Sequence, residues 1–399
     1  MTPFCSGFCP TAEAAGGRYH AEVNRTLKGH ILTPQGFVDG SMAFDEAGRV
    51  LDVSGTPVDE NAVRESAQAI VLPGFIDLHV HGGGGHDIME GADAALHVAQ
   101  CHAAHGTTAL LATTMTAPLG DLEAAFTGLR ASVAERQPRA ARVLGVHLEG
   151  PYINAGKLGA QPDFTRPVSL TEITQLNAIA PIRLITLAPE VAGNMDTIRT
   201  LADAGYLVQV GHTLGTYEDG VEALAQGARG FTHLFNAMTG LHHRAPGIAG
   251  AALAHAQYAE VIPDLLHVHP GALRVALRAI PCLYCVTDST SATGMPDGDY
   301  KLGRQTVTKC LGGVRLADGT LAGSTLTMDV ALRNLTGELG LGLAEASARV
   351  STHAANHLGL ADRGRLTPGA WGDAVVLDRD LNLKNVYVEG VSIELAHAD

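Results

Sequence analysis

Apolar runs of strand length alternate with longer amphipathic runs through the middle of the chain. The strand-like runs cover residues 70–82, 107–115, 142–151, 182–190, 206–213, 230–238, 260–268 and 282–290. Helix-like runs lie between several of them, at residues 94–106, 121–136, 194–205 and 216–228, and most end at or near a glycine, as a helix C-cap does. Nearly continuous apolar strands that alternate with helices are typical of a parallel sheet covered by helices. Eight such strands predict an α/β fold, a closed (β/α)8 TIM barrel, rather than an open sheet.

The two ends of the chain carry shorter apolar runs, separated by turns rich in Gly and Asp, that predict β-hairpins. Residues 28–71 and 359–399 are each too few to build a good core alone. We therefore predict that they pair as one small β-sandwich domain built from both chain termini. The barrel is then assigned to residues 72–358. Residues 1–27 are interpreted as a loose N-terminal leader that need not be ordered.

Composition agrees with this division. The 399 residues suit one barrel of roughly 250 residues plus an accessory part of about 100. Hydrophobic residues make up 46% of the chain and charged residues only 17%, which excludes a disordered protein. With 27 Lys and Arg against 41 Asp and Glu, and with no basic run, the chain is not expected to bind nucleic acid.

The sequence contains neither a visible membrane span nor a secretion signal. Its longest stretch without Asp, Glu, Lys or Arg, residues 94–120, contains three histidines and would not enter hydrocarbon as a continuous apolar helix. The first residues lack a basic segment followed by an apolar one. Six cysteines are too few for a disulfide scaffold of this length. We therefore expect a reduced, cytoplasmic protein with no membrane partner.

Imidazoles and carboxylates gather at the ends of the predicted strands. His79 and His81 are two residues apart, so on a strand they point to the same side. Other strand ends carry His147, Glu149, His212, His233, Asn236, His267, His269 and Asp288. In a barrel, function gathers at the C-terminal ends of the strands, and these groups are ligands of Zn, Fe and Mn. A lone strand histidine is more often a hydrogen-bonded core residue, but the shared placement of all of them predicts a metal centre.

Asp288 and Arg244 indicate what such a centre would do. A carboxylate that faces a metal cluster can hold a water and take its proton, then act as general acid to a leaving group. The alternative for Asp288 is a helix N-cap before Ser289. Arg244 lies in the loop after the sixth strand, where an arginine can either pair with a phosphate through two hydrogen bonds or remain solvated.

Several segments of the chain together carry a family resemblance. They read LPGFIDLHVHG, HLEGPY, VGHT, FTHLFNAM, HVHP, VTDSTSATG and LAGSTLTM. These segments, spread between about Leu32 and Leu377, resemble the N-acetylglucosamine-6-phosphate deacetylases of the amidohydrolase superfamily. The His-x-His of the first strand marks only the superfamily. The segments HLEGP, FTHLFNAM, Arg-x-Pro-Gly and LAGS are specific to the deacetylases.

The resemblance implies roles for individual residues. It implies that Glu149, His212 and His233 bind a metal, that His79 and His81 allow a second metal, and that Asp288 is the general acid and base. The implied substrate contacts are Asn236, Ala237, Arg244 on the phosphate side, His267, Asp264, Ala160, Gln161, Leu321, Ala322 and Gly323. The implied cofactor is one or two divalent metal ions per subunit, with Zn the first expectation and Fe, Mn or Co as alternatives.

Two segments depart from the family pattern. The family commonly has Lys-Gly-Ala-His after HLEGP, whereas this chain has Gln161 at the position of that histidine. A glutamine can still donate a hydrogen bond, but it cannot carry a proton. The common Ala-Asp-Gly before His-Val-His is Ile262-Pro263-Asp264-Leu265-Leu266 here. Both changes leave the predicted metal ligands intact and leave fine substrate selection open.

The resemblance implies that the chain deacetylates N-acetyl-D-glucosamine 6-phosphate, in amino-sugar catabolism or cell-wall sugar recycling, as a homodimer. The nearest alternative is another amidohydrolase, acting on a different N-acyl amino sugar, an N-acyl amino acid or a cyclic amide. Cyclic-amide members usually place a carboxylated lysine on strand four, and residues 182–190 contain no lysine. A remote alternative is a non-catalytic barrel scaffold, which would be expected to have lost metal ligands.

Overall fold

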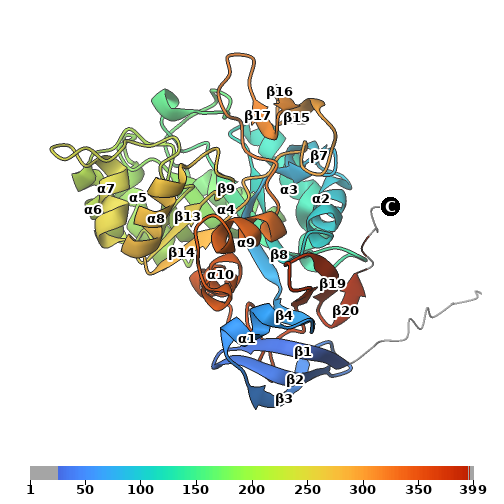
Figure 1. Ribbon diagram of the computed structural model, residues 1–399. Helices are drawn as coiled ribbons and strands as arrows, with labels where there is room; N and C mark the ends of the chain where they lie inside the picture. The colour runs from blue at the N-terminus through green and yellow to red at the C-terminus, as the bar shows by residue number, and fades with distance from the viewer. Residues whose placement is uncertain (1–25, 394, 396–399) are drawn as a thin grey trace, which may run out of the picture.

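A barrel of strands and surrounding helices is the larger part of the computed structural model, which describes residues 26–393 and 395 (Figure 1). Its wall is a ring of eight parallel strands. The strands are β5 (Phe75–Val80), β8 (Thr107–Thr114), β9 (Arg142–Glu149), β10 (Ile182–Leu187), β11 (Leu207–Val210), β12 (Gly230–Phe231), β13 (Tyr258–Val261) and β14 (Cys282–Cys285). The first six pair in this order in one parallel sheet, and β13 pairs with β14. Both β5 and β8 are buried along their whole length, as strands covered on both faces should be.

Backbone hydrogen bonds just beyond the strand ends close the ring. Between the sixth and seventh strands, the Leu234 N–H donates to the Glu260 carbonyl at 2.9 Å. Between the eighth and first strands, the Asp288 N–H donates to the His79 carbonyl and the His81 N–H donates to the Ser289 carbonyl, each at 2.9 Å. The predicted barrel is therefore confirmed.

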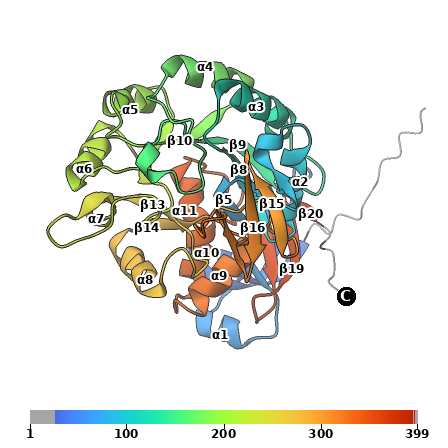
Figure 2. The same cartoon turned by 90° about the horizontal axis from the view of Figure 1, so that it is seen from above.

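Helices follow the strands around the outside of the ring (Figure 2). They are α2 (Ala94–Ala103), α3 (Leu119–Ala134), α4 (Leu170–Ile179), α5 (Asn194–Asp203), α6 (Tyr217–Gln226), α7 (Gly247–His255) and α8 (Pro270–Ala279), with α9 (Met328–Thr336), α10 (Leu343–Val350) and α11 (Thr352–His357) after the last strand. Local chemistry sets their limits: α6 begins with a capping box between Thr216 and Asp219 and ends at Gly227 in the left-handed region. In the described part of the chain, no helix is both long enough and apolar enough to cross a membrane.

Strands from both chain ends form a second, seven-stranded sheet. It contains β1 (Thr26–Thr33), β2 (Gly36–Phe44), β3 (Val50–Pro57), β4 (Ile70–Pro73), β18 (Ala374–Leu377), β19 (Leu383–Val388) and β20 (Val391–Ile393), in the order β20-β19-β18-β4-β1-β2-β3. The two ends meet where β4 pairs with β18. The apolar run 70–82 is thus shared, because β4 belongs to this sheet and β5 to the barrel. The short helix α1 (Glu60–Glu65) connects β3 to β4.

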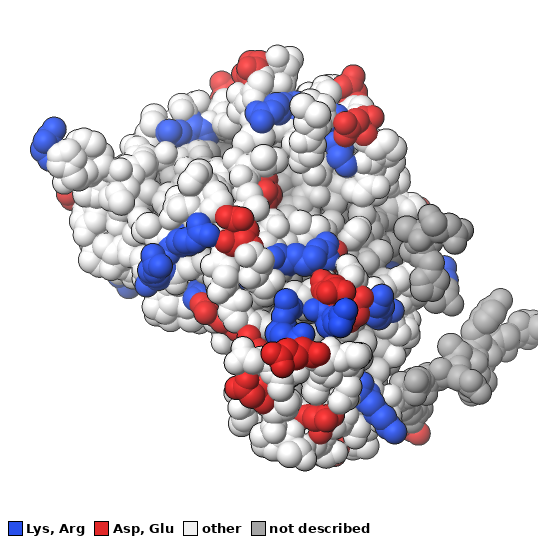
Figure 3. All heavy atoms as spheres, in the orientation of Figure 1, with Lys and Arg blue, Asp and Glu red and all other residues white. Residues whose placement is uncertain are grey.

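This sheet starts at Thr26, inside the segment interpreted as the leader; residues 1–25 lie outside the described part of the chain. A separate sheet built from both termini is confirmed, while the sandwich domain and its limits remain a prediction. On the face shown in Figure 3, basic and acidic side chains are intermingled, with no broad basic surface.

A three-stranded antiparallel sheet between β14 and α9 lies over the mouth of the barrel (Figures 1 and 2). Its strands are β15 (Gly298–Leu302), β16 (Gln305–Cys310) and β17 (Gly313–Arg315). Leu302, Val307 and Val314 pack in a small core of their own with Met115 of the barrel. The sequence pattern did not reveal this sheet. Short elements also lie near the mouth: β6 (Gly82–Gly83), β7 (His86–Asp87), η1 (Ile88–Glu90) and η2 (Ala155–Lys157).

Candidate active site and metal centre

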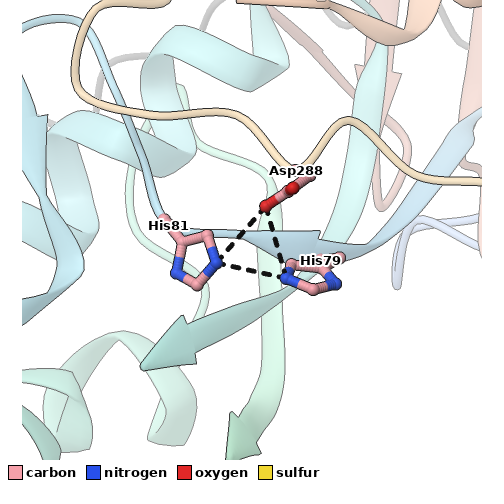
Figure 4. Close-up of side chains that lie close together, drawn as sticks. All are labelled: His79, His81 and Asp288. Atoms are coloured by element: carbon pink, nitrogen blue, oxygen red, sulfur yellow. Dashed lines mark hydrogen bonds and ion pairs between the residues drawn. The ribbon is translucent and has the colours of Figure 1, made fainter. Parts of the chain in front are cut away.

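One group of possible metal ligands lies where β5 and β14 end. The side chains of His79, His81 and Asp288 point toward one another (Figure 4). The Nε2 atoms of the two histidines are 3.1 Å apart. The Asp288 Oδ1 atom is 3.4 Å from His79 Nε2 and 3.3 Å from His81 Nε2. The His-x-His spacing works as predicted, because alternate residues of β5 face the same side.

A second group of possible ligands lies beside the first. Glu149 Oε1 is 3.1 Å from the Nε2 atoms of both His212 and His233, and these two nitrogens are also 3.1 Å apart. The same carboxylate reaches the first group, since its Oε2 is 3.1 Å from His81 Nε2. Glu149 therefore stands between the two groups. The five predicted metal ligands and Asp288 converge at one mouth of the barrel.

Three of these residues have a backbone conformation that L-amino acids rarely adopt. The φ angles of His212, His233 and Asp288 are 49°, 28° and 50°. Such conformations cost about 1–3 kcal/mol each and persist where surrounding contacts hold them. The His212 carbonyl, for example, accepts a hydrogen bond from the Asn154 N–H at 2.9 Å. The turns aim these side chains at the pocket from the points where their strands end.

Hydrogen bonds to the opposite ring nitrogens prepare three of the four histidines, His79, His81 and His212, for a metal. Nδ1 of His81 lies 3.2 Å from the Thr113 carbonyl, and Nδ1 of His212 lies 2.7 Å from the Lys157 carbonyl. A carbonyl only accepts, so Nδ1 carries a proton in both rings, and Nε2 is the nitrogen left to bind a cation. Nδ1 of His79 is held in the same way by a carboxylate. Converging lone pairs and carboxylates fit a divalent cation.

The electrostatics of the two groups point the same way. Burial works to raise the pKa of Glu149, but the charges of His79 and His212 outweigh it and hold this pKa well below its usual range. Burial works to lower the pKa of His81, but its hydrogen bonds to Asp288 and Glu149 raise it to about 9. The carboxylates therefore favour positive charge among them. A divalent cation that binds these ligands releases their protons.

A pocket of about 340 Å³ opens above the two groups. The predicted residues that line it are His81, Glu149, Ala160, Gln161, His212, His233, Asn236, Ala237, His267, Asp288, Leu321 and Gly323. His79 is fully buried beneath them. Asp264 is not among the residues that line the pocket; its Oδ2 is 2.6 Å from Nδ1 of His267. Asp264 therefore orients the His267 ring rather than lining the pocket.

Two predicted substrate contacts lie away from this pocket in the described chain. Ala322 is buried in the small core beneath the three-stranded sheet. Arg244 lies in an exposed loop, where its Nη1 is 2.8 Å from Nε2 of His243. A single chain therefore does not bring Arg244 to the pocket.

The structure also adds residues that the sequence did not single out. Met115, Lys157, Leu158, Leu302 and Thr320 line the pocket as well. Lys157 lies in the segment after HLEGP, four residues before Gln161. Leu302 comes from the three-stranded sheet, which no strand-end rule could place at the mouth.

Gln161 contacts Glu149, one of the predicted metal-binding residues. Its Nε2 donates to Glu149 Oε2 at 2.6 Å, and its Oε1 accepts from the Thr116 N–H at 2.6 Å. The amide is buried, so both bonds are shielded from water. The glutamine therefore orients the carboxylate that stands between the two groups.

We expect Gln161→Leu to weaken metal binding about 10–100-fold, because the variant removes a hydrogen bond from a ligating carboxylate. Competition with a chelator measures this affinity. Asp163→Asn, at an exposed position two residues further on, is the matched control and should bind metal like the unaltered protein. Unchanged affinity in Gln161→Leu would show that the bond to Glu149 is dispensable.

The fold and the site define the chain as a barrel hydrolase with a candidate metal centre at the strand ends. The profile of the amidohydrolase family matches residues 70–393, and the chain belongs to this family. Within the family, the chain falls among deacetylases of phosphorylated N-acetyl amino sugars, as two similar relatives indicate.

Relatives and solved structures agree in this respect. The chain is 38% identical over 333 residues to the N-acetylglucosamine-6-phosphate deacetylase of Lysinibacillus sphaericus, covering 82% of this chain and 86% of the relative. It is 37% identical over 367 residues to the N-acetylgalactosamine-6-phosphate deacetylase of Escherichia coli O157:H7, covering 90% and 96%.

Two solved structures extend the likeness to three dimensions. The N-acetylglucosamine-6-phosphate deacetylase of Thermotoga maritima superposes with a TM-score of 0.84 at 31% identity, covering 92% of this chain and 99% of that one. A mutant of the Mycobacterium smegmatis enzyme, in complex with N-acetyl-D-glucosamine-6-phosphate, gives 0.82 at 33% identity, covering 91% and 97%. The resemblance inferred from sequence motifs is therefore confirmed.

Proposed function

We propose that the chain hydrolyses the acetamide of N-acetyl-D-glucosamine 6-phosphate, releasing acetate and D-glucosamine 6-phosphate. The observation that carries this proposal is the convergence of Glu149, His212, His233 and Asp288 beneath a pocket of about 340 Å³. Two relatives that match most of the chain are named for this activity. The structure of the Mycobacterium smegmatis mutant in complex with N-acetyl-D-glucosamine-6-phosphate supports the same substrate.

The two ligand groups would hold one or two divalent cations. A bound cation supplies positive charge that acidifies water and stabilises a developing oxyanion. The imidazole and carboxylate donors suit Zn first, with Fe, Mn and Co as alternatives. His79 and His81 are both present and correctly placed, which supports a second cation in each subunit. Elemental analysis of the purified protein determines the metal and its number.

Asp288 carries the proton in the proposed reaction. Its carboxylate accepts a proton from water as the water oxygen bonds to the acetamide carbonyl carbon. The same proton then passes from Asp288 to the amide nitrogen as the C–N bond breaks, so that the amine leaves neutral. His267, held by Asp264, lies in the wall above and is available to hydrogen-bond the sugar.

Positive charge for the sugar phosphate comes from two places. Lys157 is the one lysine or arginine among the described residues that line the pocket. Arg244 projects on an exposed loop, so we propose that it reaches the phosphate in the neighbouring subunit of a homodimer. Remote binding of the phosphate would orient the acetamide toward the reacting groups.

The second candidate substrate is N-acetyl-D-galactosamine 6-phosphate, the C4 epimer. The E. coli relative that bears this name covers 90% of the chain at 37% identity. Gln161 and the segment Pro263-Asp264-Leu265 depart from the common pattern near the pocket, so both sugars need to be compared.

We also propose a cytoplasmic location, which the free thiols of Cys101, Cys282, Cys285 and Cys310 support.

An acetate-release assay across a substrate panel tests the proposed function. The panel contains both phosphorylated epimers, free N-acetylglucosamine, an N-acetyl amino acid and a cyclic amide. We expect the largest kcat/KM for N-acetyl-D-glucosamine 6-phosphate. A preference for the galacto epimer would select the second candidate, and a preference for the amino acid or the cyclic amide would overturn the assignment.

We expect Arg244→Ala to raise KM for the phosphorylated sugar about 10–100-fold, since a charge-assisted hydrogen bond contributes roughly 1.5–3 kcal/mol. KM for free N-acetylglucosamine should hardly change. The matched variant Lys157→Met separates the two sources of positive charge. Equal effects of Arg244→Ala on both sugars would show that Arg244 does not bind the phosphate.

A further inference from the structure

A fully buried carboxylate lies beneath the metal centre, outside the pocket. Glu260 is on β13, a strand otherwise apolar along its inner half, and its side chain has no exposure to solvent. It does not line the pocket, so it cannot contact a substrate there. Burying a carboxylate is costly unless its oxygens are hydrogen-bonded. Glu260 therefore needs hydrogen-bond partners within the barrel interior, and these partners indicate its role.

The carboxylate of Glu260 contacts both ligand groups. Its Oε2 is 3.0 Å from Nδ1 of His79, which belongs to the first group. The same oxygen accepts a hydrogen bond at 3.2 Å from the backbone N–H of His233, which belongs to the second group. The carboxylate of one residue thus holds the ring of one ligand and the backbone of another.

A chain of buried polar groups holds the second oxygen of Glu260. The Tyr284 hydroxyl donates to Oε1 at 3.3 Å and accepts from Nε2 of Gln209 at 2.6 Å. Gln209 Oε1 in turn accepts from the Thr232 hydroxyl at 3.0 Å. Every contact along this chain is between side chains of the barrel interior, so Glu260 has little freedom to turn away from His79.

We propose that Glu260 is a positioning residue for the metal centre, an inference that rests on the proposed function. By accepting from Nδ1–H of His79, it selects the tautomer in which Nε2 has a lone pair for a cation bound together with His81 and Asp288. By accepting from the His233 N–H, it holds the left-handed backbone that aims His233 at Glu149. One buried carboxylate thereby fixes the positions of His79 in the first ligand group and His233 in the second.

A different role for Glu260 is less well supported by the contacts. Glu260, His79 and His147 lie close enough to form a metal-ligand group of their own. Both ring nitrogens of His147 are already engaged, however: Nδ1 is 3.1 Å from the Leu78 carbonyl and Nε2 is 2.7 Å from the Thr186 hydroxyl. We therefore assign Glu260 to hydrogen bonding rather than to a third metal.

Glu260→Leu tests the proposal in the full-length protein. We expect metal affinity, measured by titrating the metal-free protein with Zn against a competing chelator, to fall about 10–100-fold. Under metal-saturating conditions kcat should fall, while KM for the phosphorylated sugar should stay within about twofold, because Glu260 does not touch the pocket. Tyr284→Phe is the matched control: it removes the contact to Oε1 but keeps the bond to His79, and should change metal affinity much less.

Glu260→Gln provides a second test of the positioning role if the Glu260→Leu variant does not fold. Its amide oxygen can still accept from His79, so metal affinity should fall only a fewfold, with KM again unchanged. Affinity equal to that of the unaltered protein in both folded variants would overturn the proposal, as would a rise in KM without loss of metal. Loss of one complete metal equivalent with unchanged affinity for the others would instead support a ligand role and also overturn it. Failure of the substrate panel with intact metal binding would remove the proposed function and leave this test valid.

Discussion

Replacing Asp288 with asparagine should lower kcat roughly 10²–10⁴-fold, the range that a positioned general acid and base contributes. Burial works to raise the pKa of Asp288, but the charges of His79 and His81 outweigh it and lower this pKa to about 2. The group is therefore a carboxylate at neutral pH, able to accept a proton. Asparagine has almost the same shape and cannot do so.

Metal content distinguishes this loss of chemistry from loss of the site. Asp288 belongs to the group with His79 and His81, whereas Glu149, His212 and His233 form a group without it. Metal held by the latter group should therefore remain, as elemental analysis would show. Asp297→Asn, at an exposed position in the segment that follows, is the control and should leave kcat unchanged. A kcat for Asp288→Asn near that of the unaltered protein would remove Asp288 from the reaction.

The largest effect on stability is expected for Arg363→Met, with a loss of about 3–5 kcal/mol. The buried Arg363 guanidinium contacts Asp373 at 2.5 Å and also pairs with Glu389. Glu389 further pairs at 3.3 Å with Arg136, which follows barrel helix α3, so the network joins the barrel to the sheet of the termini. Removing the guanidinium leaves two carboxylates facing each other with little solvent.

Urea unfolding at two pH values measures this effect. Burial raises the pKa of Asp373, and Arg363 works against that rise. Without Arg363 the pKa of Asp373 rises further above its unfolded value, so its destabilising contribution grows as the pH rises above about 4. The deficit should therefore be larger at pH 7 than near pH 4. The exposed pair Arg379–Asp380 supplies a control, because Arg379→Met should change the free energy of unfolding by at most about 0.5 kcal/mol. A deficit below about 1 kcal/mol for Arg363→Met would contradict the prediction.

Much of the barrel and of its site could be predicted because the signals are local. The period of apolar residues identifies a strand such as β8 without reference to its neighbours. The rule that parallel strands end at one rim then brings Glu149 and His212 together although 63 residues separate them. The placement of His79 and His81 on one side follows from the two-residue period of a strand.

Other features depend on contacts that no local pattern contains. The three-stranded sheet at the mouth has a polar, irregular sequence, so its position could not be foreseen. Gln161 lines the pocket and also donates to Glu149, whereas Asp264 contacts His267 and does not line the pocket. Neither contact follows from a local pattern. Arg244 carries a family motif, yet its loop extends away from the pocket of its own chain.

By itself the sequence determined the order of the barrel strands, the pairing of the two ends, the residue types of the candidate site and the rim on which they gather, because these follow from periodicity and residue chemistry. Tertiary structure alone decided which ring nitrogen faces the centre, which backbone turns aim His233 and Asp288, and that the buried Glu260 contacts both His79 and His233. Hydrogen bonds between residues distant in the chain select these features. Their energies depend on distance and burial, which exist only after the barrel has closed.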